Sequence, residues 1–371
     1  MSRLGTPWAG SAAPPPGIAG VDAGCPDATA PPSHGAADEG RHGAPGAAPA
    51  AAWPAPRRAL ARADLSLLVS SLCVLAVLLV GSGINASFLT PRYLLQQAEV
   101  AAFLGLVASG QMLVILLGHI DLSVPWTIAA SAMLATGLGG QAAGGALGVP
   151  IALAVGAAIG LVNGLGVARL RVPSMIFTLG VNAALQGLMV LYTGGSAPPS
   201  TAPPLVGWLA TGQVVPGVAN AVWSWVAVSL LLTLVLRRTP LGRGIYAIGT
   251  RERAAYLCGL PVRGIVVACF MANSMLCALC GLLLSGYAGK AYQGMGDTYL
   301  LPAIAAVVLG GTSIMGGRGR VAGTVVGTVL VVLLQSVLAV MQMPDAGRQI
   351  IYGLVILGML LLYGRGGKAG T

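Results

Sequence analysis

The chain has 371 residues, of which 56% are hydrophobic and 8% are charged. Soluble domains carry about 25% charged residues, and a soluble fold lacks the polar surface to enclose so much apolar side chain. The composition therefore predicts an all-α integral membrane protein. The formal net charge of +10 would suit nucleic acid. Because the arginines lie mainly at the ends of apolar stretches, we interpret them as a topology signal and expect no nucleic-acid partner.

Residues 1–56 consist mainly of Ala, Pro, Gly and Ser with scattered charges. A segment of this composition cannot bury enough apolar area to offset the loss of chain entropy. We therefore expect a disordered cytoplasmic tail, followed by one polytopic transmembrane domain over residues 57–371.

Apolar stretches divide the transmembrane domain into about ten predicted spans, because a bilayer core about 30 Å thick needs about 20 helical residues. Two of these stretches are short and interrupted, which leaves a range of eight to eleven. The predicted spans are residues 65–84, 97–118, 122–140, 146–168, 174–193, 218–236, 264–286, 300–315, 321–342 and 349–364.

The distribution of basic residues fits ten spans with both termini in the cytoplasm. On that topology fifteen Lys and Arg residues lie at inner ends and three at outer ends, as the positive-inside rule requires. The inner ones are Arg57, Arg58, Arg62, Arg169, Arg171, Arg237, Arg238, Arg243, Arg251, Arg253, Arg263, Arg318, Arg320, Arg365 and Lys368; the outer ones are Arg92, Lys290 and Arg348.

The predicted cytoplasmic loop 237–263 holds six arginines and a single acidic residue, Glu252. Its stretch RERAAYLCGL is compatible with a short helix outside the bilayer. Gly259 followed by Pro261 is typical of a helix C-terminus. We expect one apolar side on this helix, made of Ala254, Ala255, Tyr256, Leu257 and Leu260.

Polar side chains near or within the spans are candidates for a solute path. Asp121 and Ser123 stand where span 122–140 begins, and they can accept backbone N–H bonds there. Asn182 and Gln186 lie four residues apart on one face of an otherwise apolar span. Buried amides need partners, so these two either bind a neighbouring helix or line a polar pathway.

Glycines spaced four apart predict close helix packing in two spans. Gly156, Gly160 and Gly164 share one face, and Gly319, Gly323 and Gly327 share another. We expect packing inside one subunit more than a dimer seam. The proline-rich segment 194–217 is expected outside, with Trp208, Trp223 and Trp225 forming an interfacial belt.

Several kinds of chemistry are excluded by missing motifs. The sequence has no GxxxxGK[ST] phosphate loop and no HExxH zinc motif, so we expect no catalytic residue, no metal site and no cofactor bound by this chain. Cys277-x-x-Cys280 has no second pair nearby and is interpreted as two small apolar residues. Glu99, Asp121 and Asp297 lie near predicted span ends, whereas ion-coupled carriers place carboxylates near the midplane.

Four blocks in order resemble the signature segments of ABC-transporter permeases of the ribose/xylose type. They are GHIDLSV, PSMIFTLG with LYTGG, TPLGRGIYAIGTRERAAYLCGL, and IAAVVLGGTSIMGGRGRVAGTVVG, and the resemblance covers roughly residues 64–364. The resemblance implies the permease fold of an importer in a bacterial cytoplasmic membrane. It also implies that the chain is a transport subunit and not an enzyme.

The resemblance further implies partners and roles. Two copies would form the pathway, a separate ATPase subunit would use ATP and Mg, and a periplasmic or lipid-anchored binding protein would deliver a monosaccharide such as ribose, xylose or galactose. The coupling helix in the ATPase cleft would comprise Arg251, Arg253, Ala254, Ala255, Tyr256, Leu257 and Gly259. For the pathway we assign Asp121, Ser123, Asn182 and Gln186.

Three departures leave the substrate open. His119 replaces a glycine of the usual GGIDLSVG block, and Pro125 and Trp126 stand where small residues are expected. Alternatives are a permease of the same superfamily for nucleosides, branched-chain amino acids or autoinducer-2, and an ion-coupled carrier that works alone.

Overall fold

The computed structural model describes residues 56–139, 146–195, 201–344, 346–351, 353–354 and 357. The predicted tail therefore lies outside the described residues apart from Pro56, and so does most of the predicted last span, 349–364.

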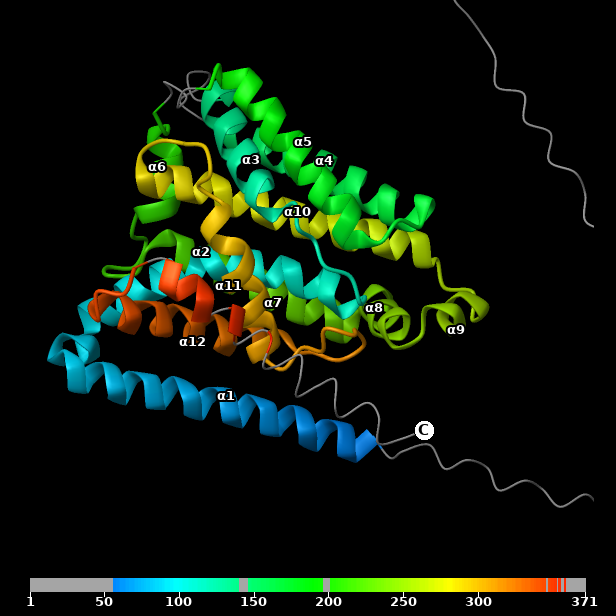
Figure 1. Cartoon of the computed structure of the whole chain (residues 1–371), viewed down its shortest axis with the longest axis horizontal. Coiled ribbons are helices and arrows are strands. Elements are labelled where there is room, and N and C mark those ends of the chain that lie inside the picture. The colour runs from blue at the N-terminus through cyan, green and yellow to red at the C-terminus, as the bar shows by residue number, and fades with distance from the viewer. Residues whose placement is uncertain are drawn as a thin grey trace, which may run out of the picture. The chain divides into compact units, whose positions relative to one another are not determined.

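The described elements are helices joined by short connections (Figure 1). They are α1 (Pro56–Ile84), η1 (Ala86–Leu89), α2 (Pro91–Leu116), α3 (Val124–Gly139), α4 (Gly148–Leu170), α5 (Ser174–Thr193), α6 (Pro204–Thr211), α7 (Asn220–Arg238), α8 (Pro240–Thr250), α9 (Glu252–Leu257), α10 (Val262–Ala288), η3 (Asp297–Tyr299), α11 (Leu300–Leu309) and α12 (Val321–Val340).

Seven helices in the described part are long and apolar enough to cross a membrane: α1, α2, α4, α5, α7, α10 and α12. Two shorter apolar helices, α3 and α11, match the stretches that the sequence marks as short and interrupted. The prediction for α11 is wrong at its end, because the helix stops at Leu309 and the chain turns through Gly310 and Gly311 instead of continuing to residue 315.

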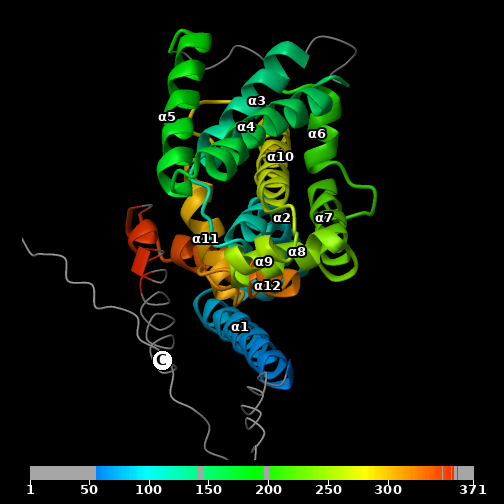
Figure 2. The same cartoon turned by 90° about the vertical axis from the view of Figure 1, so that its right-hand side faces the viewer.

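Helix α10 lies at the centre of the bundle and contacts α2, α3, α4 and α6 (Figures 1 and 2). Helix α2 is the most buried span, and α12 and α7 pack against it. Helix α1 contacts the outer side of α12 and exposes most of its apolar residues, as expected of a helix that faces lipid.

The contact between α4 and α10 depends on the predicted glycine stripe. A Cβ on Gly156 would stand 2.7 Å from the carbonyl oxygen of Ser274, and one on Gly160 would stand 2.6 Å from that of Phe270. Both distances are below van der Waals contact, so only glycine lets the two helices approach this closely. Gly327 packs in the same way against Ala306 of α11. The predicted packing inside one subunit is confirmed for Gly156, Gly160 and Gly327, whereas Gly319 lies before α12 begins at Val321 and does not share a helix face with Gly327.

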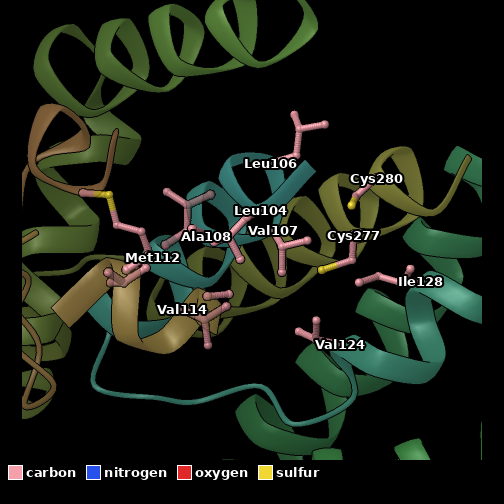
Figure 3. Packing of buried hydrophobic residues seen from close by; sticks show 14 of the residues in the cluster. Leu104, Leu106, Val107, Ala108, Met112, Val114, Val124, Ile128, Cys277 and Cys280 are labelled. Carbon is pink, nitrogen blue, oxygen red and sulfur yellow. The ribbon is translucent and has the colours of Figure 1, made fainter. Parts of the chain in front are cut away.

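Figure 3 shows the apolar core where α2, α3 and α10 meet. Cys277 and Cys280 of α10 are fully buried there among aliphatic side chains of α2 and α3. This confirms that the two cysteines pack as small apolar residues.

The segment before α7 contains one short helix, α6. Its residues Val206 and Ala210 are buried and pack against α10 at Gly286. Trp208 is exposed, as predicted for an interfacial residue, but Trp225 is buried against Gly105 of α2. The prediction of an interfacial Trp225 is therefore wrong, because α7 turns this side chain toward α2.

Candidate functional site

Basic residues gather at one end of the bundle. Figure 1 shows the α4–α5 connection, α8, α9 and the α11–α12 connection at this end. Arg169, Arg237 and Arg238 lie in the last turns of α4 and α7, where cations also stabilise the helix dipole. This is the end that the sequence predicts to be cytoplasmic.

Helix α8 lies against this end as an amphipathic element. The hydroxyl oxygen of Thr239 accepts a hydrogen bond from the N–H of Gly242 at 3.3 Å, and Pro240 occupies the first turn, so the sequence begins the helix there. Ile245 and Ile248 are buried against the bundle. The apolar face of α8 therefore fixes the helix to the spans.

The C-terminal end of α8 meets two other segments in a backbone junction. Gly249 lies directly against the carbonyl oxygen of Leu116, the last residue of α2. The same carbonyl accepts a hydrogen bond of 2.9 Å from the N–H of Gly317 in the α11–α12 connection. Gly317 has a φ of +73°, which a side chain would strain. We call these three residues the glycine junction.

Tyr246 adds a side-chain bond near the junction. Its hydroxyl donates a hydrogen bond of 2.8 Å to the carbonyl oxygen of Gly319. Burial is the main cause that raises the pKa of Tyr246, so the phenol stays a neutral donor at physiological pH. This bond holds α8 to the α11–α12 connection.

Helix α9 follows α8 directly and points its apolar side chains in two directions. Ala255 is only 5% exposed and faces the bundle, whereas Tyr256 and Leu257 are 70% and 84% exposed. The expected single apolar side is therefore wrong, because a six-residue helix cannot turn consecutive residues to one face. Gly259 ends the turn with a φ of +79°, as predicted.

The exposed tip of α9 has the properties of a docking surface. Arg251, Arg253 and Ala254 are exposed beside Tyr256 and Leu257. Two large apolar side chains flanked by arginines match an apolar pocket with an acidic rim. We call these five residues the docking tip; of the predicted coupling residues, Ala255 and Gly259 do not belong to it.

Asp121 is the centre of a polar cluster that is separate from the docking tip. Its side chain is 1% exposed. Oδ1 accepts hydrogen bonds from the N–H of Ser123 at 2.8 Å and from its hydroxyl at 2.7 Å, and Oδ2 accepts one of 2.8 Å from Nδ2 of Asn273 on α10. Three donors satisfy the buried carboxylate. The predicted backbone bond exists, but it forms a turn before α3 and does not cap the helix.

Further hydrogen bonds connect the α2–α3 loop to other helices. Nδ2 of Asn163 on α4 donates 2.8 Å to the Ser123 hydroxyl, and Nε2 of Gln111 on α2 donates 3.2 Å to the Asp121 carbonyl. On α5, the Thr178 hydroxyl accepts a 2.9 Å bond from the Leu122 N–H. The loop between α2 and α3 is thus bonded to α2, α4, α5 and α10.

The other two predicted pathway residues have different positions. Oδ1 of Asn182 accepts a hydrogen bond of 3.3 Å from the N–H of Trp126, so this residue binds α5 to α3. Gln186 lies one turn further on the exposed face of α5. The structure brings Asp121 and Ser123 together. Asn182 contacts the start of α3 instead, and Gln186 is not part of the Asp121 cluster. Trp126 itself is buried in the core.

Sequence reasoning missed Asn163 and Asn273. Each is a lone amide in a long apolar helix, and each is fully buried in the structure. A buried amide requires a hydrogen-bonding partner, so their isolation in apolar spans was an available signal. Their partners in the α2–α3 loop were not readable, because those contacts join residues far apart in the chain.

The family model described as "Branched-chain amino acid transport system / permease component" matches residues 93–362. The chain belongs to this permease family. The matched region of the permease contains the docking tip, the glycine junction and the Asp121 cluster.

Curated relatives of this permease share about a third of its residues. It is 36% identical over 313 residues to the ribose import permease protein RbsC of Escherichia coli (strain K12), covering 82% of this chain and 96% of the relative. It is 34% identical to the RbsC of Bacillus subtilis (strain 168), covering 77% and 89%. It is 33% identical to the autoinducer 2 import system permease protein LsrC of Enterobacter sp. (strain 638), covering 81% and 87%. No solved structure matches the permease.

Proposed function

We propose that this permease is the transmembrane subunit of an ATP-driven importer that carries a monosaccharide into the cell across a bacterial cytoplasmic membrane. The observation that carries the proposal is the docking tip. Leu257 is 84% exposed at the basic end, on a helix that is too short to cross the bilayer. The exposed pair Tyr256 and Leu257, with Arg253 nearby, is a surface that suits a protein partner, and the sequence has no phosphate-binding loop.

The proposed partner at the docking tip is an ATPase subunit that uses ATP and Mg. A binding protein would supply solute at the opposite end, and a second copy of the permease would complete the pathway. The positive-inside distribution supports a cytoplasmic position for the docking tip and for both termini.

The contacts suggest how movement would pass from the ATPase to the spans. The docking tip continues into α8, whose end is held at the glycine junction against the last residue of α2. Five residues beyond Leu116, Asp121 bonds the α2–α3 loop to α10, and its neighbours bond it to α4 and α5. Close-packed elements transmit displacement with little compression. A push on α9 would therefore shift the α2–α3 loop together with three spans.

The proposed substrate is ribose or a similar monosaccharide, because ribose import permeases are among the most similar curated relatives. Autoinducer-2 is the second candidate, supported by the 33% identity to an autoinducer 2 import permease. His119 lies near Phe270 and Trp126 is buried in the core. Their positions therefore do not distinguish ribose from autoinducer-2 as the substrate.

The proposal is tested by transport in proteoliposomes that contain the permease, its ATPase subunit and the cognate binding protein. We expect ATP-dependent uptake of radiolabelled ribose, with autoinducer-2 and leucine as competitors in parallel. ATP-dependent uptake of autoinducer-2 in place of ribose would select the second candidate. Uptake that needs no ATPase, or that follows an imposed proton or sodium gradient, would overturn the proposal in favour of an ion-coupled carrier.

A further inference from the structure

A cavity of about 310 Å³ opens beside the short apolar helix α11. The wall of this cavity comes from the middle of α2, η3, the start of α11, the second half of α12 and residues 348–349. Its size lies at the lower end of the range of about 300–1,000 Å³ for small-molecule sites. Five polar residues line it: Asp297, Thr298, Gln335, Arg348 and Gln349.

Part of the wall lies below the outer ends of the helices that form it. Gln335 precedes the end of α12 at Val340 by about 8 Å, and Leu104 lies about 20 Å from the start of α2, at about 1.5 Å per residue. Polar and charged groups at membrane depth are costly and mark solute sites. The polar residues Asp297, Gln335 and Arg348 therefore make the cavity a candidate site for a polar solute.

The side chains are also available for a ligand. Within the described residues, Asp297, Thr298 and Gln335 donate or accept no side-chain hydrogen bond and form no ion pair with protein. Asp297 and Thr298 are exposed and Gln335 is half-buried, so their side chains are accessible to water and to a hydroxylated solute that takes its place.

The cavity lies next to short helices, which supports its role as a solute site. Helix α11 has 10 residues and α3 has 16, so both are shorter than the about 20 residues that cross a bilayer core. The two meet where Gly296, just before η3, lies against the carbonyl oxygen of Pro125 on α3. Transporter sites commonly lie beside such discontinuous helices.

We propose that this cavity binds one neutral monosaccharide on its way through the permease; the assignment of a sugar rests on the proposed function. The Asp297 carboxylate accepts hydrogen bonds from sugar hydroxyls, and the Gln335 amide both donates and accepts them. Leu104 and the ring of Tyr299 contact the C–H face of the sugar. A carboxylate opposite an arginine disfavours solutes of either net charge, and an apolar solute would leave the Asp297 and Gln335 side chains unbonded.

The first test is protection of a cysteine. Thr298→Cys is placed in the complete importer after Cys25, Cys73 and Cys258 are changed to Ser, which leaves only buried native cysteines. Labelling from outside by a membrane-impermeant maleimide should slow about 5- to 10-fold in saturating ribose, and not in sucrose, which is too large. Val214→Cys, which lies on the exposed outer segment, is the matched control and should label equally with and without ribose.

The second test is uptake. Gln335→Leu and Asp297→Asn should each raise the half-saturating ribose concentration about 5- to 10-fold, the loss of one hydrogen bond. The cavity assignment alone is overturned by one set of results. In that set, the wild-type importer takes up ribose, ribose does not slow labelling of the Thr298→Cys variant, and both uptake variants transport ribose normally. A wild-type importer that takes up no monosaccharide overturns the proposed function and the sugar assignment with it.

Discussion

Asp121 shows how one residue can hold several helices together. Its buried carboxylate has three donors, from Ser123 and from Asn273 on α10. A buried acceptor with all its bonds contributes to stability, whereas a mismatch leaves a donor unpaired. The sequence predicts Asp121 to line a solute path. In this structure its carboxylate is hydrogen-bonded to Ser123 and Asn273 and links the α2–α3 loop to α10.

Replacing Asp121 by Asn should destabilise the permease by about 1–3 kcal/mol, because an amide NH₂ then faces a donor. The check is the thermal midpoint of the purified permease in detergent, which should fall. Gln186→Ala is the control and should leave the midpoint within experimental error, since this side chain is exposed on α5. Equal midpoints for the two variants would contradict the structural role of Asp121.

Gly160→Ala should cost about 1–3 kcal/mol of stability, because its methyl group would overlap the backbone of α10 at Phe270. Gly180→Ala is the matched control on α5, where an added Cβ meets nothing within 4 Å. Its midpoint should be unchanged or slightly raised, since alanine favours the helix. The comparison is made by thermal unfolding; a Gly160→Ala midpoint equal to wild type would contradict the close α4–α10 contact.

At the scale of elements, the short helix α9 presents the docking tip, and α8 connects it to the spans. The glycine junction is the narrowest point of this connection, because three backbone segments touch there without side chains. A substitution at this point alters the transmission of movement without touching the docking tip.

Gly249→Ala should therefore reduce ATP-dependent uptake several-fold while ATPase binding persists, because the methyl group would push α8 away from Leu116. The control is Gly264→Ala near the start of α10, where an added Cβ meets nothing within 4 Å. Binding is measured by co-purification of the ATPase subunit and transport by uptake in proteoliposomes. Wild-type uptake by Gly249→Ala would contradict the proposed route through the junction.

Most helices were predictable from the sequence, because apolar length and flanking charge mark them directly. The predicted span 174–193 matches α5 at both ends, and 321–342 exceeds α12 by two residues. The end of α11 was missed since Gly310 and Gly311 stand inside an apolar run. The direction of Ala255 was also missed, because it depends on how α9 lies against the bundle.

The candidate site was predictable only in part. Asp121, Ser123 and Leu257 were nominated from local sequence, since each stands in a recognisable block. Their partners were not, because Asn273 lies 152 residues from Asp121 and Asn163 lies 40 residues from Ser123. The polar cavity is lined by residues of four elements, α2, η3, α11 and α12. No local sequence pattern predicts that these elements lie side by side.

For the whole molecule, the positive-inside distribution predicts which end faces the cytoplasm. Cys258, exposed just after α9, should react with a membrane-impermeant maleimide only after the cells are permeabilised. In a variant with Cys25, Cys73 and Cys258 changed to Ser, Lys290→Cys should react in intact cells. The reverse pattern would contradict the proposed orientation.

The central claim is that energy enters this permease from another chain through the docking tip. The direct measurement compares wild type with Leu257→Arg in proteoliposomes that contain the ATPase subunit and the binding protein. ATP hydrolysis and ribose uptake are recorded in the same vesicles. We predict that the variant keeps the wild-type thermal midpoint, because Leu257 is 84% exposed, and loses both uptake and the binding protein's stimulation of ATP hydrolysis. Undiminished uptake and stimulated hydrolysis by Leu257→Arg would contradict the account.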